Sequence, residues 1–403
     1  MHSFKMKVNS QISLKGEVKL LHSIFFVFGF GIMAWVPRFP EVKENLGLSN
    51  GAFGSILTTG SIGAFIGLLI AGHIVHKVGV RIVLIISTFL LYGSFAAIVR
   101  VHSPALFIVF NIAIGLSITA THVAINAQGF HIQERSGENV IVSSAGYWSA
   151  GALITAIFSG FLAGRIGLAE HIGGVAILSG LLSLLIVRLM GPSLVPANLH
   201  PETDYAIKDI FTTFHFDWRV SLGLACAVYL EFAIGDWGTI FTKERLDVSA
   251  SLSTLPYIVF TVFMITGRLS VRRLTEKYVM HQLARVMTLI AGIGFVSTIS
   301  IATHLPADSK WISYGLFLLG FALAGIGSSI LGPTFTAAAN RRSPNPSAVV
   351  IGQLGVANNV ITTLLKWFVA GVIGATGSIA LAMMIPGVLM ILASLFTPVI
   401  KEK

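Results

Sequence analysis

The chain has 403 residues, of which 54% are apolar and only 11% charged, and its formal net charge is +10. Because a soluble domain carries roughly a quarter charged residues, this composition excludes a water-facing surface over most of the molecule. Apolar runs near 20 residues, long enough to cross about 30 Å of hydrocarbon, recur along the chain and predict a polytopic membrane protein. The single cysteine, Cys226, excludes an intramolecular disulfide and a Cys-rich metal site.

The first predicted element is a membrane helix that the protein retains. Its apolar run continues into the bulky sequence WVPRFP, whereas a signal peptide has a shorter apolar core and a small-residue cleavage site. Breaks at Gly, Pro and charged residues delimit the helices that follow. The twelve predicted helices cover residues 18–38, 51–74, 80–99, 104–130, 140–164, 168–190, 218–241, 251–273, 281–303, 311–337, 347–373 and 376–399.

A long polar segment, residues 191–217, divides these helices into two sets of six. We therefore expect an all-α polytopic membrane protein with two pseudo-symmetric six-helix bundles. If the N-terminus is cytoplasmic, most Lys and Arg residues lie on the cytoplasmic side, as the positive-inside rule requires. The positive charge then reflects topology and anionic headgroups rather than nucleic-acid binding. The expected parts are a tail (1–17), an N-terminal bundle (18–190), a cytoplasmic linker (191–217), a C-terminal bundle (218–399) and a cytoplasmic C-terminus (400–403).

A weak internal repeat relates the two halves. The sequence GHIVHKVGVR (72–81) after the second helix and GRLSVRRLTEKY (267–278) after the eighth occupy the same place in their halves. Each is interpreted as a turn that combines a helix-terminal Gly with basic residues. Glycine-rich stretches in helices 5 and 11 also match in position and favour close helix packing.

On these features the whole chain resembles the major facilitator superfamily. The resemblance implies two six-helix halves, a cytoplasmic linker and a protein that works as a monomer. It also implies that the first loop is a conformational switch. The family has an acidic residue where this chain has His76, so the usual role of that acid in locking the outward-open state is not expected to transfer. The switch residues implied are Gly72, His76, Lys77, Gly79 and Arg81.

A narrower resemblance is to the branch that contains fucose permease. It is carried by AWVPRFPEVKENLGLSNGAFGSIL, HVAINAQG, EFAIGDWG and GIGSSILGPTFTAAANR. Fucose-type permeases have an acid in helix 1 and another in helix 4, where this chain has Val36 and His122. A basic residue common in helix 4 of proton-coupled relatives is replaced by Asn111. The fucose-type proton pathway is therefore not intact in this chain. The resemblance is not taken to imply specificity for sugars.

In this architecture helices 1, 4, 7 and 10 line a central cavity, with the substrate near the midplane. Glu231 lies about 18 Å along helix 7 from Arg219, near the middle of the bilayer. An ionisable group at that depth is by default a functional candidate. Glu231 is interpreted as a proton-coupling site, and the alternative is a structural salt bridge or a hydrogen-bonded neutral acid. Asp236 is either a gate or partner residue or an acid at the outer rim.

Two further residues are proton-coupling candidates. Lys366 in helix 11 is hypothesised to form an ion pair with helix 7, and the alternative is a lysine that reaches to the outer interface. His122 titrates in the physiological range and suits a proton switch, unless it is a buried, hydrogen-bonded histidine.

The substrate-binding candidates are polar and aromatic residues of the predicted cavity helices. Arg38, between two prolines, is a candidate for binding an anionic group or for anchoring the chain at the outer interface. Most buried polar groups connect helices instead of touching substrate, and aromatic packing is the usual role of Trp35. The remaining candidates are Asn126, Gln128, Tyr147, Trp148, Ser328, Gln353 and Asn358.

Other functional classes lack support in the sequence. His73 and His76 have no third or fourth ligand, so no metal site is expected, and no cofactor is expected. Walker-type, GxSxG and HExxH motifs are absent, so the sequence indicates neither an ATP-driven pump nor an enzyme. The sequence predicts a secondary transporter of a small polar organic solute in the bacterial inner membrane, with transport coupled to protons. The alternatives are a proton-antiport exporter and a non-transporting receptor of the same fold.

Overall fold

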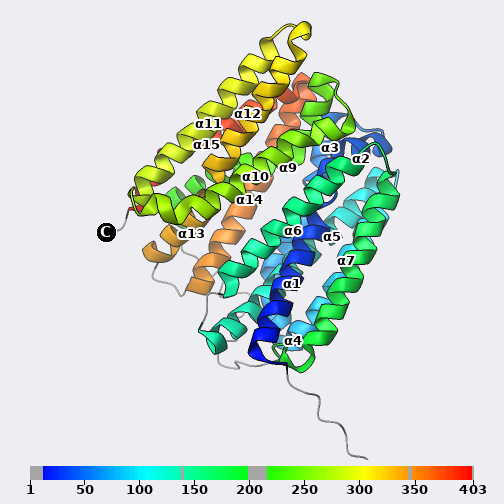
Figure 1. Cartoon of the computed structure of the whole chain (residues 1–403), viewed down its shortest axis with the longest axis vertical. Helices are drawn as coiled ribbons and strands as arrows, with labels where there is room; N and C mark the ends of the chain where they lie inside the picture. Colours follow the sequence, from blue (N-terminus) through cyan, green and yellow to red (C-terminus); the bar gives the residue numbers. More distant parts are fainter. Residues whose placement is uncertain (1–11, 138–139, 198–215, 344–346, 402–403) are drawn as a thin grey trace, which may run out of the picture.

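The structure, a computed structural model, describes residues 12–137, 140–197, 216–343 and 347–401 (Figure 1). All regular elements in these residues are helices, which confirms the predicted all-α class. The first half contains α1 (Leu14–Met33), η1 (Val36–Arg38), α2 (Phe39–Leu46), α3 (Asn50–Leu57), α4 (Gly60–Ile98), α5 (Pro104–Ser136), α6 (Val140–Leu162), α7 (Leu168–Met190) and η2 (Gly191–Ser193). The second half contains α9 (Trp218–Leu246), α10 (Ala250–Thr275), α11 (Met280–His304), η4 (Ala307–Ser309), α12 (Lys310–Ser328), α13 (Leu331–Arg342), α14 (Ser347–Thr376), α15 (Ile379–Ala393) and η5 (Thr397–Ile400).

Ten helical stretches of the described residues are long and apolar enough to cross a membrane. One of them, residues 50–98, has 49 residues, which is enough for two crossings. It turns at Gly79, whose φ of 82° lies in a region that favours glycine. The helix α15 is apolar but shorter, with 15 residues. Counting the two limbs separately and adding α15 accounts for the twelve predicted crossings.

Proline explains where two predicted helices end differently from the prediction. The first, predicted to reach residue 38, ends at Met33, and the chain continues as a short 3₁₀ helix around Pro37. The tenth, predicted as continuous over 311–337, is two helices, α12 and α13. Because Pro333 has no N–H, it cannot donate to the carbonyl of Ser329, and the helix breaks there.

The predicted turn at residues 267–278 is wrong in its first part, because α10 continues to Thr275. Gly267 lies inside this helix and permits a close helix contact: a Cβ on Gly267 would lie only 2.3 Å from the Ser329 hydroxyl oxygen. The glycine is therefore required by packing against α12 and does not mark the helix end.

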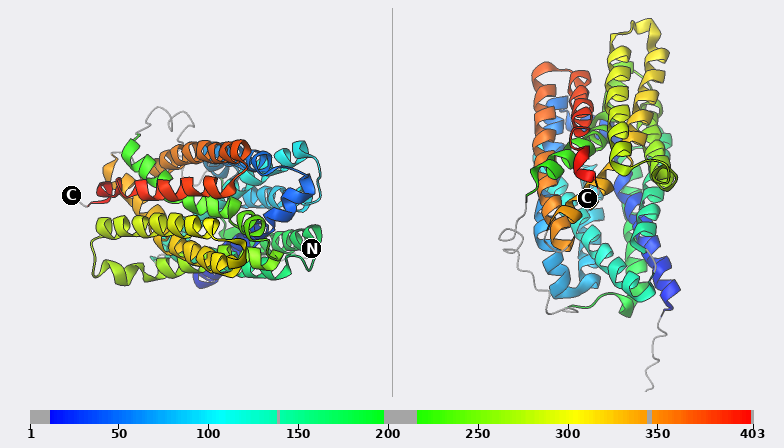
Figure 2. Two further views of the ribbon diagram at one scale, coloured as in Figure 1. Left: turned by 90° about the horizontal axis from the view of Figure 1, so that it is seen from above. Right: turned by 90° about the vertical axis from the view of Figure 1, so that its left-hand side faces the viewer.

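The helices form two halves, seen in Figure 1 as the blue-to-green and the green-to-red groups and again in both views of Figure 2. Between the halves α3 and the first limb of α4 meet α14, and α6 meets α10. In each case the second helix of one half contacts the fifth helix of the other, so the two contacts are equivalent when the halves are exchanged. The two-bundle architecture is therefore the one that the sequence predicts.

We call the end at which α1 begins, α7 ends and α9 begins the linker end, and the opposite end, at α2 and the α9–α10 turn, the far end. The predicted linker, residues 191–217, falls mostly on residues 198–215, which lie outside the described residues. Its first residues pack on the α4 turn, since the Val80 N–H donates to the Val195 carbonyl at 3.0 Å. The domain boundaries themselves stay a prediction.

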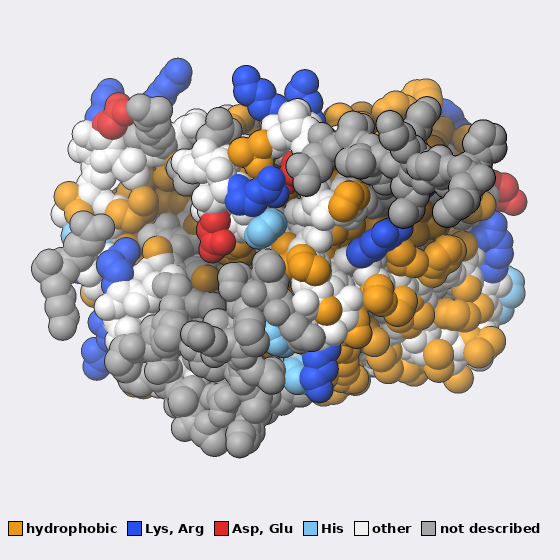
Figure 3. All heavy atoms as spheres, turned by 90° about the horizontal axis from the view of Figure 1, so that it is seen from below, with side chains coloured by type: hydrophobic (Ala, Val, Ile, Leu, Met, Phe, Trp, Pro, Cys, Tyr) orange, Lys and Arg blue, Asp and Glu red, His pale blue; other side chains and the backbone are white. Residues whose placement is uncertain are grey.

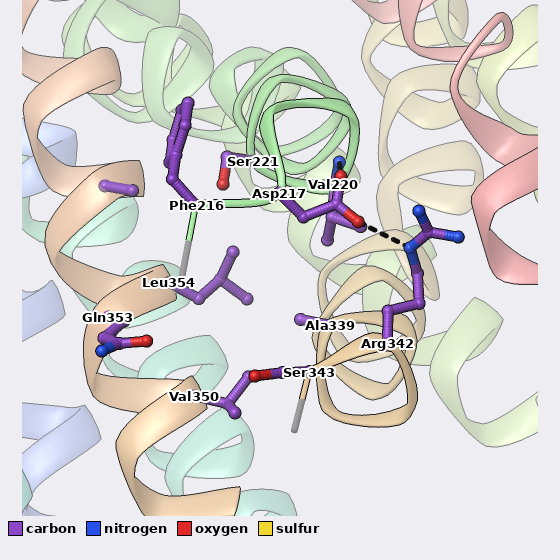
Figure 4. Close-up of a pocket in the computed structure, with 11 residues that line it drawn as sticks. Phe216, Asp217, Val220, Ser221, Ala339, Arg342, Ser343, Val350, Gln353 and Leu354 are labelled. Atoms are coloured by element: carbon purple, nitrogen blue, oxygen red, sulfur yellow. Dashed lines mark hydrogen bonds and ion pairs between the residues drawn. The ribbon is translucent and has the colours of Figure 1, made fainter. Parts of the chain in front are cut away.

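Asp217 begins the second half at the linker end (Figure 4). Its carboxylate caps α9 by accepting from the backbone N–H groups of Arg219 and Val220, and it accepts from Arg342 Nε at 2.6 Å. Burial alone would raise the pKa of Asp217, but the hydrogen bonds and charge of Arg342 and the two N–H groups lower it below the usual value. The carboxylate thus joins the start of α9 to the end of α13.

Replacing Asp217 should weaken this junction in a graded way. Asp217→Ala removes both the cap and the ion pair and should lower the melting temperature in detergent, since losing a cap alone costs about 1 kcal/mol. Asp217→Asn keeps a capping group, so its melting temperature should lie between those of wild type and Asp217→Ala. Because the folded-state pKa is lowered, the ion-pair stabilisation is present at neutral pH and lost as pH falls through that pKa. The difference between wild type and Asp217→Asn should therefore shrink in acid; an Ala variant as stable as wild type would contradict this role.

Candidate functional site

A cavity of about 500 Å³ lies between the two halves. Pockets of this size accommodate small organic molecules. Its walls are mostly apolar and come from α1, η1, α2, α3, α4, α5 and α6 of the first half and from α9, α10 and α14 of the second. The polar side chains that line it are Ser61, Asn111, Ser149, Glu231, Asp236, Tyr257, Thr261, Asn359, Thr362 and Lys366.

Glu231 lies in the cavity wall on α9. About a third of its side chain, 35%, is exposed, and its nearest cationic group is Arg268 Nη2, at 4.0 Å from Oε1. This distance is at the limit of an ion pair and too long for a direct hydrogen bond. The carboxyl group therefore faces the cavity with its oxygen atoms open to a solute, water or a proton.

Asp236, one and a half turns further along α9, is paired with Lys366 of α14. The Lys366 Nζ lies 2.7 Å from Oδ2 of Asp236, and both side chains are mostly buried. The same ammonium group is 5.4 Å from the centre of the Phe232 ring, within the range of a cation–π contact. Of the two acids on α9, the lysine thus meets Asp236 and not Glu231.

The wall from the first half contributes no charged side chain to this cavity among the described residues. Two predicted candidates, Trp35 and Trp148, line it, but Trp35 is 7% exposed and packs edge-on against Phe39 and Phe95. Asn111 also lines it, with its amide donating to the carbonyls of Ile56 and Leu57. The charges of the cavity therefore belong to the second half.

Arg38 does not reach the cavity. Its side chain is fully buried, and its guanidinium binds both carboxylate oxygens of Glu41, at 2.7 and 2.5 Å, the Ile166 carbonyl at 2.8 Å and His171 Nδ1 at 2.8 Å. These partners occupy its donors and fix the chain after α1 against the start of α7. An anionic substrate would have to displace Glu41.

Three candidates on α5 lie outside the cavity lining. His122 is exposed and lies 6.4 Å from Phe28, with the rings nearly parallel. Asn126 donates to the carbonyl of His122 at 2.8 Å. Gln128 is buried and joins α5 to the segment after α7, by donating to Ser193 O at 2.9 Å and accepting from Val195 N at 2.8 Å.

The remaining binding candidates are also outside the lining. Tyr147 stacks on His22 at 4.4 Å between ring centres. Gln353 lines the small linker-end cavity shown in Figure 4. The Ser328 hydroxyl and the Asn358 carbonyl oxygen are buried without a hydrogen-bond partner in the described residues. Asn359, the residue after Asn358, lines the central cavity instead.

The predicted switch loop lies at the linker end, at the turn of α4. Gly79 forms the turn and contacts the chain after α7, because a Cβ there would lie 3.0 Å from Ala197 N. Gly72 has open space around it, and Lys77 and Arg81 are exposed. The role of this loop, which includes His76, stays a prediction.

Four charged residues join the two halves at the far end. Lys43 of α2 is paired with Glu244 of α9, and Glu44 accepts from Lys243 at 2.5 Å. Asn50 donates to Glu244 at 2.7 Å and accepts from Lys43 at 2.7 Å. The two pairs are reciprocal, because each half supplies one lysine and one glutamate.

Sequence reasoning missed this far-end quartet (Lys43, Glu44, Lys243 and Glu244), although a repeat marks it. The sequences KENLGLS (43–49) and KERLDVS (243–249) occupy equivalent places in the two halves. In both, the helix ends in a residue of left-handed conformation, Gly47 or Asp247. The repeat brings opposite charges together because the halves face each other at this end.

The packing behind the quartet closes the far end. A Cβ on Gly51 would lie 2.6 Å from the Cα of Gly374, and one on Gly54 would lie 2.4 Å from the Trp237 ring, so α3 packs directly on α14 and α9. By contrast, the ion pairs described at the linker end, Arg135–Glu17 and Arg342–Asp217, each stay within one half.

A cavity between two helical bundles that are joined at one end is typical of a membrane transporter. The described residues hold no cluster of three or more His, Cys, Asp or Glu side chains that could bind a metal ion.

The chain belongs to the Major Facilitator Superfamily, whose family model matches residues 21–365. It is 23% identical to an uncharacterised MFS-type transporter of Yersinia pestis over 332 residues, which are 82% of each chain. The solved structures that share the fold include two transporters. A mutant of the nucleoside transporter NupG has a TM-score of 0.75 at 11% identity, over 97% of this chain and 100% of that one. A variant of the E. coli fucose:proton symporter has a TM-score of 0.66 at 17% identity, with the same coverage. The protein is accordingly a multi-pass membrane transporter and not an enzyme.

Charge reversal should test whether the far-end quartet holds this end closed. Lys43→Glu places two carboxylates together and should open the far end, because like charges repel. The measurement is the labelling rate of a cysteine at Asn359, in a Cys226→Ser background, by an impermeant maleimide added at the far end. The rate should rise several-fold in Lys43→Glu and return in Lys43→Glu/Glu244→Lys. Arg165→Glu, which makes the same charge change at this end outside the quartet, is the control; equal rates in all variants would contradict the role.

The Asp236–Lys366 pair should behave as a mostly buried ion pair. Lys366→Met leaves Asp236 without its partner and should destabilise the protein by up to about 3 kcal/mol, the cost of an uncompensated buried charge. Asp236→Asn/Lys366→Met removes both charges and should recover most of the loss. Thermal unfolding in detergent measures both. If Asp236→Asn/Lys366→Met is less stable than Lys366→Met, Asp236 and Lys366 do not stabilise each other as an ion pair.

Proposed function

We propose that the protein moves a small polar organic solute, such as a sugar, an organic acid or a similar metabolite, through this cavity and couples the movement to protons at Glu231. The observation that carries the proposal is the position of Glu231: it lies in the wall of a mostly apolar cavity, with its nearest cation 4.0 Å away. An ionisable group at such a depth is costly and is retained at functional sites.

The two acids of α9 would divide their roles. Asp236 is occupied by Lys366 at 2.7 Å, whereas the oxygens of Glu231 are open to the cavity. Glu231 is therefore the group that can exchange a proton with water or with a solute without first breaking a close ion pair. The resemblance in fold to the fucose:proton symporter is in keeping with proton coupling.

The polar groups of the cavity suit a solute with several hydrogen-bonding groups. Ser61 and Ser149 come from the first half, and Thr261, Asn359 and Thr362 from the second. A solute that bridges both walls would contact neutral hydroxyl and amide groups on either side and charged groups only on the second half.

The charge distribution favours a cytoplasmic linker end in a bacterial inner membrane. Figure 3 views the molecule from below and shows Lys and Arg side chains around the linker end, with hydrophobic side chains over one flank. Among the described residues, Lys77, Arg135 and Arg342 lie at this end. With the positive-inside rule this orientation makes the far end periplasmic, and the closed far end then corresponds to an inward-facing state. We propose that the protein acts as a monomer.

Uptake by purified protein in liposomes with an internal pH dye tests the function. Pools of sugars, organic acids, amino acids and nucleosides are applied, and one pool should shift the internal pH. Glu231→Gln should abolish this shift and uphill accumulation while leaving downhill exchange of the same solute, because a neutral amide cannot carry a proton.

Glu170→Gln, at an exposed acid in the first turn of α7, is the matched control and should transport like wild type. Uphill accumulation by Glu231→Gln would refute the coupling role. Substrate binding without flux by wild type would instead favour a receptor, and an outward proton-driven flux would favour an exporter.

A further inference from the structure

Arg268 is the cation nearest to Glu231, and its role is not explained by the membrane topology. The sequence places it with the basic cluster that includes Arg273 near the end of α10, where the positive-inside rule accounts for such residues. In the structure it lies seven residues before the end of that helix, roughly 10 Å deeper along its axis. Its side chain is 37% exposed and lies beside the cavity acid.

A second group near Arg268 is a backbone carbonyl that the sequence leaves without its helical partner. In a continuous helix the N–H of residue 333 would donate to the carbonyl of Ser329, but residue 333 is proline. Helix α12 ends at Ser328 and α13 begins at Leu331, so the break lies at this carbonyl. The next hydrogen bond of the ladder, from Thr334 N to Ile330 O, is formed at 3.2 Å.

Arg268 supplies the missing donor. Its Nε donates to the Ser329 carbonyl at 3.3 Å, and Nη2 of the same guanidinium lies 4.0 Å from Glu231. The planar fork of an arginine offers donors in fixed directions, so a shift of the guanidinium toward one acceptor weakens its bond to the other, and the ammonium of a lysine does not reproduce this geometry. Gly267 permits this arrangement, because any Cβ there would collide with the Ser329 side chain.

The surroundings of Glu231 contain few other charges. Tyr257 of α10 lines the same cavity, and Asp236 and Lys366 form their own pair. Arg268 is thus the cation that responds to the charge of Glu231. Ionised Glu231 attracts the guanidinium of Arg268. When Glu231 is neutral, the guanidinium stays with the Ser329 carbonyl.

We propose that Arg268 is a positioning residue that couples the protonation state of Glu231 to the helix break between α12 and α13. Ionised Glu231 competes with the Ser329 carbonyl for Arg268 and loosens the break, whereas protonated or solute-bound Glu231 releases Arg268 to cap the end of α12. Since α13 contacts both α9 and α14, a change at the break reaches the linker end of the second half. This inference rests on the proposed proton role of Glu231.

Amide hydrogen exchange across residues 326–336 tests the coupling without a known substrate. The protein is measured in nanodiscs at one mildly alkaline pH as wild type, Glu231→Gln, Arg268→Gln, Arg268→Lys and Glu231→Gln/Arg268→Gln. Glu231→Gln should slow exchange by roughly two- to tenfold, the factor that one hydrogen bond contributes to local opening. Arg268→Gln should speed it, and Glu231→Gln should then have no effect in the Arg268→Gln background. Arg268→Lys should behave like Arg268→Gln, because a point charge does not replace the fork.

Asp236→Asn is the matched control, since it neutralises the other acid of α9 and should leave exchange across 326–336 unchanged. Unchanged exchange in Glu231→Gln, or an effect of Glu231→Gln that persists without Arg268, would overturn the coupling. These outcomes are independent of the liposome assay. If Glu231→Gln still accumulates solute, the proton role fails whatever the exchange shows, and if only exchange fails to respond, the proton role stands without this link.

Discussion

The cost of placing charge between two apolar helix bundles governs the centre of this molecule. Each ionised group there needs a counter-charge or a hydrogen-bond partner, because the surrounding hydrocarbon side chains cannot solvate it. The first half meets this constraint by presenting neutral groups to the cavity. The second half meets it with Asp236 paired to Lys366 and with Glu231 beside Arg268. The looser of these two contacts is the one that leaves a carboxyl group available for exchange.

The same constraint explains the helix breaks and close contacts around the cavity. A proline in a membrane helix frees a carbonyl, which then needs another hydrogen-bond donor. Arg268 does so for the Ser329 carbonyl. At the far end, outside the hydrocarbon, the constraint is relaxed, and half-buried lysines and exposed glutamates can join the halves through pairs that are weak individually. Charge pairs in the middle that stay within the second half, and weak pairs between the halves at the far end, suit halves that must separate.

The sequence predicts the fold well because the apolar runs and the Gly and Pro breaks are local signals. It also places Asp236 and Lys366 at similar depths, and the structure brings them together. It does not reveal which face of a helix meets the cavity, and for that reason Gln128 and Arg38 were candidates although backbone and Glu41 contacts occupy them. Arg268 was missed because it belongs to a cluster of basic residues in the sequence, and the positive-inside rule alone explains such a cluster. The far-end quartet was missed because its repeat is short and its pairing requires the two halves to face each other.

Proton coupling at Glu231 requires that protonation of this residue changes how the two halves are joined. Spin labels on cysteines at Asn45 and Arg245, which occupy equivalent places in the far-end repeat, would report the separation of the halves in a Cys226→Ser background. Distributions of the distance between the two spin labels would be recorded from acid to alkaline pH, with Glu231 present and with Glu231→Gln. The account predicts that the populations shift with pH when Glu231 is present and stay constant in Glu231→Gln. A pH-dependent shift of the same size in both would contradict it.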